Sequence, residues 1–243
     1  MEPTKHNAKE KKLLYGIAGL AGISLIILIH EMGHFLFAQL FGVPTPSFSL
    51  GFGPPLFAIP IGQTIFKVAL LPFGGYVEMD QEALAKLSYL PKMLIVFAGI
   101  FFNLIFAYAI LLYYAIRNKT TLISTITSTI KPHQTTDQET AQPENTIIGP
   151  VGIISMIGKS IAIDPHLYWF ILAILSLNMG LFNIIPLPFF DGGKALIYSI
   201  EALTGTIIPP TILWLISTLF LAFFMLFIAR VTMNDIKRLI GKK

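Results

Sequence analysis

The sequence contains no cysteine, and only 12% of its residues are charged. The lack of cysteine excludes a disulfide framework and any cysteine-ligated metal, so a metal bound here must use histidine and carboxylate ligands. Soluble domains carry about 25% charged residues, so the low charge excludes an ordinary soluble protein. Since 54% of the residues are hydrophobic, the composition predicts a membrane protein.

The net charge is +4, and most of the lysine and arginine residues lie in the two tails or beside apolar stretches. Anionic lipid headgroups are the simplest partner for basic residues in those places. We therefore expect contact with membrane lipid and no nucleic-acid partner.

A charged pentapeptide, HEMGH at residues 30–34, lies inside a long apolar run from Leu13 to Val43. Ionisable residues at that depth are costly unless they are paired or bind a metal, so they mark a functional site. On a helix His30 and His34 share one face and can bind a single zinc ion, with Glu31 beside them as a candidate general base. The alternative is a pair of hydrogen-bonded core histidines, which would leave Glu31 without an obvious partner.

The apolar runs predict four transmembrane helices in one domain, residues 1–243. The first run follows a lysine-rich start, as a secretory signal does, but it is too long for one and no cleavage site ends it. It is therefore read as an uncleaved span. The predicted spans are about residues 13–42, 93–116, 165–185 and 210–229.

Residues 46–79 cannot form a long helix, because proline and glycine recur through them. Two β-branched or apolar stretches, residues 48–52 and 64–71, flank a turn at residues 61–63 and predict a β-hairpin. The hairpin is too apolar for a free loop, so we expect it to re-enter the membrane and line the metal cavity. Its edge at Val68 or Ala69 is expected to hold an unwound substrate by strand addition.

Two connecting features complete the chain. Asp80 is expected to cap a short helix between the hairpin and the second span, where Asn103 is expected to make an interhelical hydrogen bond. Residues 117–148 are the only extended polar stretch and are too short to bury a core of their own, so we expect a flexible loop outside the membrane.

A catalytic zinc site usually has three protein ligands, and the histidine pair supplies two. Within the apolar spans and the segments that interrupt them, Glu31 and Asp191 are the only acids well inside. Asp191, which follows a helix break at Pro186 and Pro188, is therefore the best candidate for the third ligand. Asn178 and Asn183 precede it on the third span, where each can bind a substrate backbone or simply a neighbouring helix.

Taken together, these motifs resemble the site-2 protease family of intramembrane zinc metalloproteases, particularly the bacterial regulator-of-sigma-E protease type. Residues 30–34 resemble its zinc motif, and residues 48–52 and 71–77 resemble its re-entrant β-loop. Ala98 and Gly99 with Asn103 resemble its second-span signature. NIIPLPFFDGG, at residues 183–193, is similar to its N-x-x-P-x-P-x-x-D-G-G motif, whose aspartate completes the zinc site.

The resemblance implies hydrolysis of peptide bonds in or near transmembrane segments of membrane protein substrates, as in regulated intramembrane proteolysis, within a bacterial inner membrane. Related bacterial enzymes carry one or two PDZ domains between the second and third core spans, where this chain has only residues 117–148. A separate adaptor is therefore a candidate partner in their place.

Two other functions are compatible with a membrane histidine pair. A di-iron oxidase needs several histidine boxes, and the chain has only 5 histidines. A non-catalytic metal-binding protein or metal transporter does not need a general base such as Glu31 beside the ligands.

Arguments about membrane orientation conflict. The positive-inside rule places both tails in the cytoplasm, whereas the family resemblance places both outside it, with the metal nearer the cytoplasmic face. Because lysines and arginines more than about 15–20 residues from a span have little influence, we expect the orientation of the family.

Overall fold

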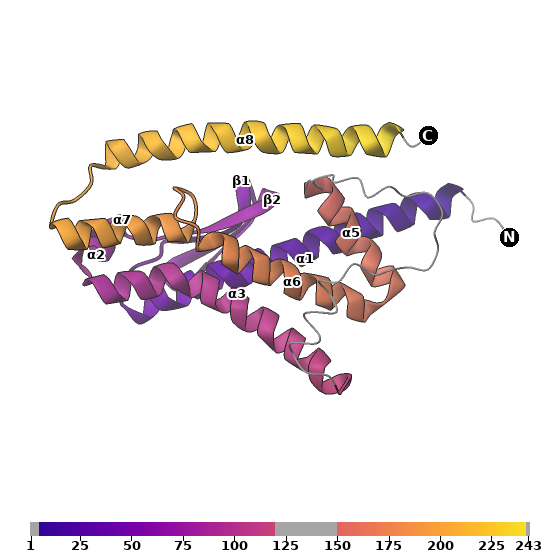
Figure 1. The fold of residues 1–243 in the computed structure, drawn as a ribbon, viewed down its shortest axis with the longest axis horizontal. Coiled ribbons are helices and arrows are strands. Elements are labelled where there is room, and N and C mark those ends of the chain that lie inside the picture. Colours follow the sequence, from indigo (N-terminus) through magenta and orange to yellow (C-terminus); the bar gives the residue numbers. More distant parts are fainter. Residues whose placement is uncertain (1–4, 120–149, 242–243) are drawn as a thin grey trace.

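The computed structural model describes residues 5–119 and 150–241 (Figure 1). In chain order its elements are α1 (Lys5–Leu40), β1 (Ser47–Ile61), β2 (Thr64–Glu78), α2 (Gln81–Lys86), α3 (Tyr89–Arg117), α5 (Pro150–Ile163), α6 (Pro165–Asn183), α7 (Asp191–Thr204) and α8 (Pro210–Gly241). Apart from its first three residues, the polar loop predicted at residues 117–148 lies outside the described part of the chain.

Among the described residues, four helices are long and apolar enough to cross a membrane: Leu13–Leu40, Tyr89–Arg117, Pro165–Asn183 and Thr211–Met233. The predicted membrane fold is thereby confirmed. α3 begins at Tyr89, earlier than expected, because Pro91 falls in its first turn, where a missing N–H costs no helical hydrogen bond. Asp80 caps α2 as predicted, since its Oδ1 accepts a hydrogen bond of 2.7 Å from Ala83 N.

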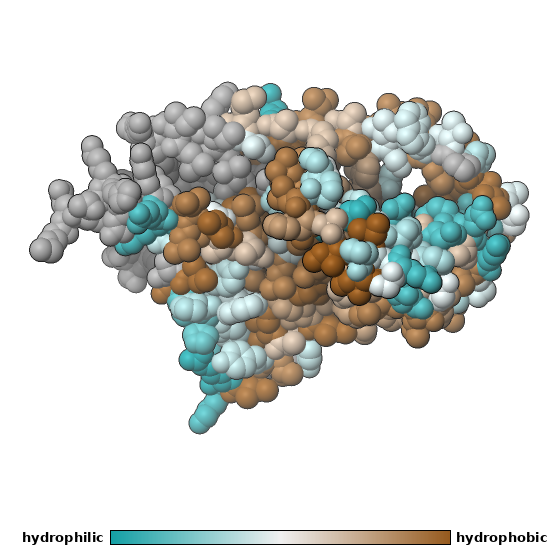
Figure 2. All heavy atoms as spheres, turned by 180° about the vertical axis from the view of Figure 1, so that it is seen from behind, coloured by the Kyte–Doolittle hydropathy of each residue, from teal (hydrophilic) through white to brown (hydrophobic). Residues whose placement is uncertain are grey.

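The surface of the molecule separates by polarity as expected for a protein that crosses a membrane. Figure 2 shows apolar residues over much of the middle of one face. Hydrophilic residues gather at the end that carries α2 and the start of α3, and at the tip where α3 ends. The chain is therefore a multi-pass integral membrane protein.

β1 and β2 form one long hairpin that folds back on itself. Its antiparallel pairs run from Ile61 and Thr64 at the tip to Ser47 and Glu78 at the base. The first residues of β1, Ser47–Leu50, also pair with residues 65–68, and the residue numbers rise together on both segments. Gly51 and Gly53 allow this fold, because their φ angles of +95° and +89° lie in a region that other residues rarely adopt.

This pairing shows that Val68 and Ala69 do not form the open edge of the sheet that the sequence predicted. Val68 pairs with Leu50 on one side and with Phe57 on the other, so it lies between two segments of the sheet. Ala69 pairs with Pro55 and is buried. One unpaired edge is formed by residues 75–78 of β2, which pair only with residues 47–50, and the other by residues 57–61 of β1, which pair only with residues 64–68. The alternation of apolar and polar residues does not reveal that residues 47–50 pair with two segments of β2, so the sequence could not show the edge at residues 75–78.

Close helix packing positions the histidine motif of residues 30–34. α1 crosses α3 at Gly33, where a Cβ atom would lie 2.5 Å from the carbonyl oxygen of Ala98. Nearer its N-terminus, α1 packs against α5 and α6 through a cluster of buried apolar residues: Ile26, Ile157, Tyr168 and Leu172. These contacts hold α1 in the centre of the molecule, with its histidine motif surrounded by other elements.

Two elements lie beyond the break at Pro186 and Pro188. α6 ends at Asn183 and α7 begins at Asp191, so the predicted helix break is present. The sequence analysis missed α7, although the Gly205 that ends it has a φ of +65°, typical of a helix C-terminus. α8 lies alongside the other helices (Figure 1), with the ring centre of its Phe220 5.5 Å from that of Phe189, and its most apolar window has no buried residue.

Candidate active site

His30 and His34 lie one turn apart on α1 and point the same way. Their Nε2 atoms are 3.2 Å apart, and both side chains are buried. His34 Nδ1 lies 2.8 Å from the carbonyl oxygen of Ile95, which can only accept a hydrogen bond. The proton of a neutral His34 is therefore on Nδ1, which leaves the lone pair of Nε2 directed at the site.

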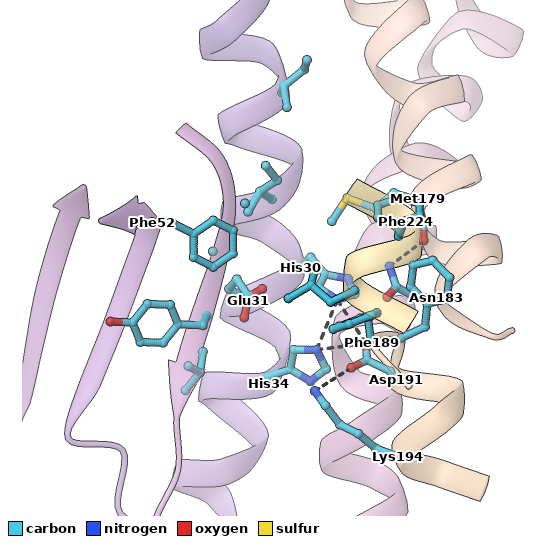
Figure 3. Close-up of a pocket in the computed structure, with 18 of the residues that line it drawn as sticks. His30, Glu31, His34, Phe52, Met179, Asn183, Phe189, Asp191, Lys194 and Phe224 are labelled. Carbon is cyan, nitrogen blue, oxygen red and sulfur yellow. Dashed lines mark hydrogen bonds and ion pairs between the residues drawn. The ribbon is translucent and has the colours of Figure 1, made fainter. Parts of the chain in front are cut away.

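Asp191 meets the two histidines from α7. Its Oδ2 atom lies 3.1 Å from Nε2 of His30 and 3.1 Å from Nε2 of His34, although they are 161 and 157 residues away in the sequence. The three candidate ligand atoms all lie within 4.8 Å of one another (Figure 3). The structure thus brings together the three metal-ligating residues proposed from the sequence.

The two glycines after Asp191 let the start of α7 pack closely against the segment before it. A Cβ atom at Gly192 would collide with the carbonyl oxygen of Ile184, and one at Gly193 with that of Leu187. Both carbonyls belong to the irregular segment that the two prolines create after α6. With glycine at both positions, the start of α7 packs directly against this segment, and Asp191 reaches the histidines.

The donor set fits a zinc ion. Two imidazole nitrogens and one carboxylate oxygen are the ligands of many catalytic zinc sites, which keep a further position open. Asp191 Oδ2 is buried and makes no hydrogen bond of good geometry among the described residues, as expected of an atom oriented for a metal.

Lys194 contacts one carboxylate oxygen of Asp191, and the histidines contact the other. Its Nζ atom lies 3.1 Å from Oδ1, one turn along α7, while Oδ2 faces the histidines. The sequence analysis missed this residue, although its i, i+3 spacing from Asp191 was a usable signal. The carboxylate is therefore held with one oxygen on a cation and the other free for a metal.

Glu31 lies on the side of α1 that faces β2, whereas His30 and His34 face Asp191 (Figure 3). It is partly buried and lines a cavity of about 540 Å³ together with the three candidate ligands. Gly75 leaves room for it, since a Cβ atom there would lie 3.0 Å from Glu31 Cγ. A carboxylate in this place can accept a proton from a water molecule in the cavity.

The proposed substrate-binding residues are not all at the cavity. Asn183 lines it, and its Nδ2 donates a hydrogen bond of 2.8 Å to the carbonyl oxygen of Met179. Asn178 is exposed on α6 and is not among the residues that line the cavity, and neither are Val68 and Ala69. The hairpin does line the cavity, as expected, through Phe52 of β1 and residues 74–77 of β2.

Comparison with known proteins agrees with this site. A model of peptidase family M50 matches residues 18–227 of the chain. Three bacterial relatives each carry a name that begins "Putative zinc metalloprotease". They are CPE1693 of Clostridium perfringens, Cj1068 of Campylobacter jejuni and slr1821 of Synechocystis, with 36%, 34% and 32% identity over 102, 167 and 112 residues.

The matched segments cover 39%, 61% and 41% of this chain, in the same order. They cover only 30%, 45% and 31% of the three relatives. The chain therefore matches less than half the length of each of these relatives.

Proposed function

This chain belongs to peptidase family M50, the site-2 protease family, and on that premise we propose that it is a zinc metalloendopeptidase. Its substrates are membrane proteins, cut in or near a transmembrane segment as in regulated intramembrane proteolysis. The observation that carries the proposal is the meeting of His30, His34 and Asp191 around one point, with Glu31 on the same cavity.

The chemistry divides among these residues. His30, His34 and Asp191 would hold the zinc ion, which supplies a Lewis acid for the scissile carbonyl and for the attacking water. Glu31 would take the proton from that water and deliver it to the leaving amine. Asn183, inside the cavity, would hydrogen-bond the substrate backbone.

The hairpin supports the binding of an extended substrate. A transmembrane helix must unwind before its peptide bonds become accessible, because its N–H and C=O groups are bonded within the helix. Residues 75–77 lie at the unpaired edge formed by β2 and line the cavity beside Glu31. A peptide added to this edge by strand addition would lie next to the general base.

Location and partners follow from the same premise. The relatives named above come from bacteria, which supports a bacterial cell membrane as the location. Substrate proteins would reach the cavity from within the membrane, in contact with lipid. A separate adaptor protein is the partner we propose for substrate selection.

A reconstitution experiment tests the proposal. The purified chain in lipid vesicles is mixed with a single-span substrate whose helix contains glycine, so that it unwinds easily. Cleavage should stop when a chelator removes the metal and return when zinc is added back. Stoichiometric zinc without cleavage of any such substrate would favour a non-catalytic metal-binding protein or transporter instead.

A further inference from the structure

We propose that Asn103 is a positioning residue for the metal site: its side-chain oxygen accepts a hydrogen bond from His30 Nδ1 and so directs His30 Nε2 at the metal. The inference rests on the zinc site of the proposed function. It assigns a specific task to a residue for which the sequence suggested only an interhelical hydrogen bond.

The starting observation is a buried amide beside a metal ligand. Asn103 lies on α3, is 0% exposed, and has its amide nitrogen 3.3 Å from His30 Nδ1. In this orientation the amide oxygen is buried and makes no hydrogen bond among the described residues. An amide nitrogen can only donate, so it would require an unprotonated Nδ1 on His30.

That arrangement conflicts with the geometry on the other side of the ring. A neutral imidazole with an unprotonated Nδ1 carries its proton on Nε2. His30 Nε2 lies 3.1 Å from Asp191 Oδ2 and 3.2 Å from His34 Nε2, where the ligand atoms converge. A proton there would block the lone pair that the metal needs.

Exchanging the amide nitrogen and oxygen of Asn103 removes the conflict. The two atoms are nearly identical in size, so their assignment follows from the hydrogen bonds they make. With the oxygen toward His30, the amide accepts from Nδ1–H, and Nε2 presents its lone pair to the metal. Histidine ligands of metals commonly donate their other N–H to such an acceptor, which fixes the tautomer.

The neighbouring ligand is held in the same way by the same helix. His34 Nδ1 donates to the carbonyl oxygen of Ile95, two turns before Asn103 on α3. Gly99 lies midway between them, and a Cβ atom there would lie 2.5 Å from His34 Nε2 and 2.8 Å from His30 Cε1. One stripe of α3, at residues 95, 99 and 103, therefore supplies an acceptor for each ring and the space in which both rings fit.

The position of Asn103 is itself supported from α6. Ser176 is fully buried, and its Oγ donates a hydrogen bond of 3.0 Å to the backbone carbonyl of Asn103. This contact involves the backbone of Asn103 and not its side-chain amide. Ser176 therefore offers a matched control for a change that disturbs the same packing without removing the acceptor.

The test measures zinc affinity of the full chain by competition with a chelator, for wild type, Asn103→Leu, Asn103→Asp and Ser176→Ala. Asn103→Leu removes the acceptor and should weaken zinc binding by about 10- to 100-fold, as loss of such a supporting contact usually does. Asn103→Asp keeps an acceptor oxygen and should restore the affinity to within about threefold of wild type. Ser176→Ala should also stay within about threefold.

Wild-type affinity in Asn103→Leu would overturn the proposal. Equal losses in Asn103→Leu and Asn103→Asp would also overturn it, because they would show that the donor group is required. Nitrogen NMR of the histidine rings in the unmutated, zinc-loaded chain gives a test independent of variant folding: His30 Nδ1 should carry a proton, and an unprotonated His30 Nδ1 would contradict us. Failure of wild type to bind zinc would instead remove the proposed function, and this inference with it.

Discussion

The residues of the candidate site differ in what holds each of them in place. His34 is fixed by a backbone carbonyl of α3, and Asp191 is fixed by the cation of Lys194. Glu31 is only partly buried and faces an open cavity. This division suits the chemistry, because ligands need a fixed orientation, whereas a general base must exchange protons with water and substrate.

At the scale of the residue, Lys194→Met should weaken zinc binding by about tenfold, because the released Oδ1 lets the carboxylate of Asp191 rotate. Methionine retains a long apolar side chain of similar shape. The measurement is zinc affinity by chelator competition, with Lys159→Met as the control, since Lys159 is exposed on α5. Equal affinity in Lys194→Met and wild type would show that the ion pair does not position the ligand.

The sequence singles out the candidate ligands but not the residues that support them. His30, Glu31, His34 and Asp191 stand out because charge is costly in an apolar chain, so they can be proposed as a site without coordinates. Asn103 is polar and inside a span, yet the sequence cannot tell which partner it meets. Only packing of α3 against α1 brings it to His30.

At the scale of the element, the close approach of α3 to α1 sets the size of the metal site. Gly99 is buried beside both imidazole rings. Its missing side chain lets the backbone of α3 pass next to the histidines, so that residues 95 and 103 reach their Nδ1 atoms. A larger residue would separate the helix from the ligands it supports.

Gly99→Ala should therefore lower zinc affinity by at least tenfold, because the added Cβ would lie 2.5 Å from His34 Nε2. Gly180→Ala on α6 is the matched control, since its Cβ would have 3.4 Å to the nearest atom, an ordinary contact. Zinc content and membrane insertion are measured for both. Normal zinc binding in Gly99→Ala would mean that the rings have more freedom than this packing allows.

The hairpin gives a second prediction at this scale. Proline removes a backbone donor, so Tyr76→Pro and Val77→Pro should differ: one N–H points outward from the edge and the other toward β1. Removal of the outward N–H should reduce cleavage while zinc stays bound. Ala58→Pro and Ile59→Pro, on the β1 segment paired with residues 66–67, are the controls. Full cleavage in both edge variants would rule out strand addition here.

The helices and strands could be predicted from the sequence where neighbouring residues determine them. The four spans follow from apolar length, and the break at Pro186 follows from proline chemistry. The second pairing of residues 47–50 depends on a fold of the hairpin over itself, so the sequence alone could not show that Val68 lies inside the sheet and that residues 75–78 form one of its edges. α7 was not predicted because its first turn contains Gly192 and Gly193, and glycine disfavours a helix.

At the scale of the whole molecule, four spans place the start of α1 and the end of α8 on the same side (Figure 1). We expect that side to be outside the cytoplasm, as in the family. A reporter enzyme that is active only outside the cytoplasm, fused after residue 243, should therefore be active. Activity of a cytoplasmic reporter at the same position would instead support the positive-inside rule for this chain.

The most direct test of the central claim compares zinc per chain and cleavage rate in wild type, Glu31→Gln and Asp191→Ala. Glutamine keeps the size of Glu31 but cannot take up a proton, so Glu31→Gln should retain zinc and lose about 10²- to 10⁴-fold in turnover. Asp191→Ala should lose both zinc and activity. Full activity in Glu31→Gln would contradict the protease mechanism, and loss of zinc in that variant alone would show that ligand and base have been assigned the wrong way round.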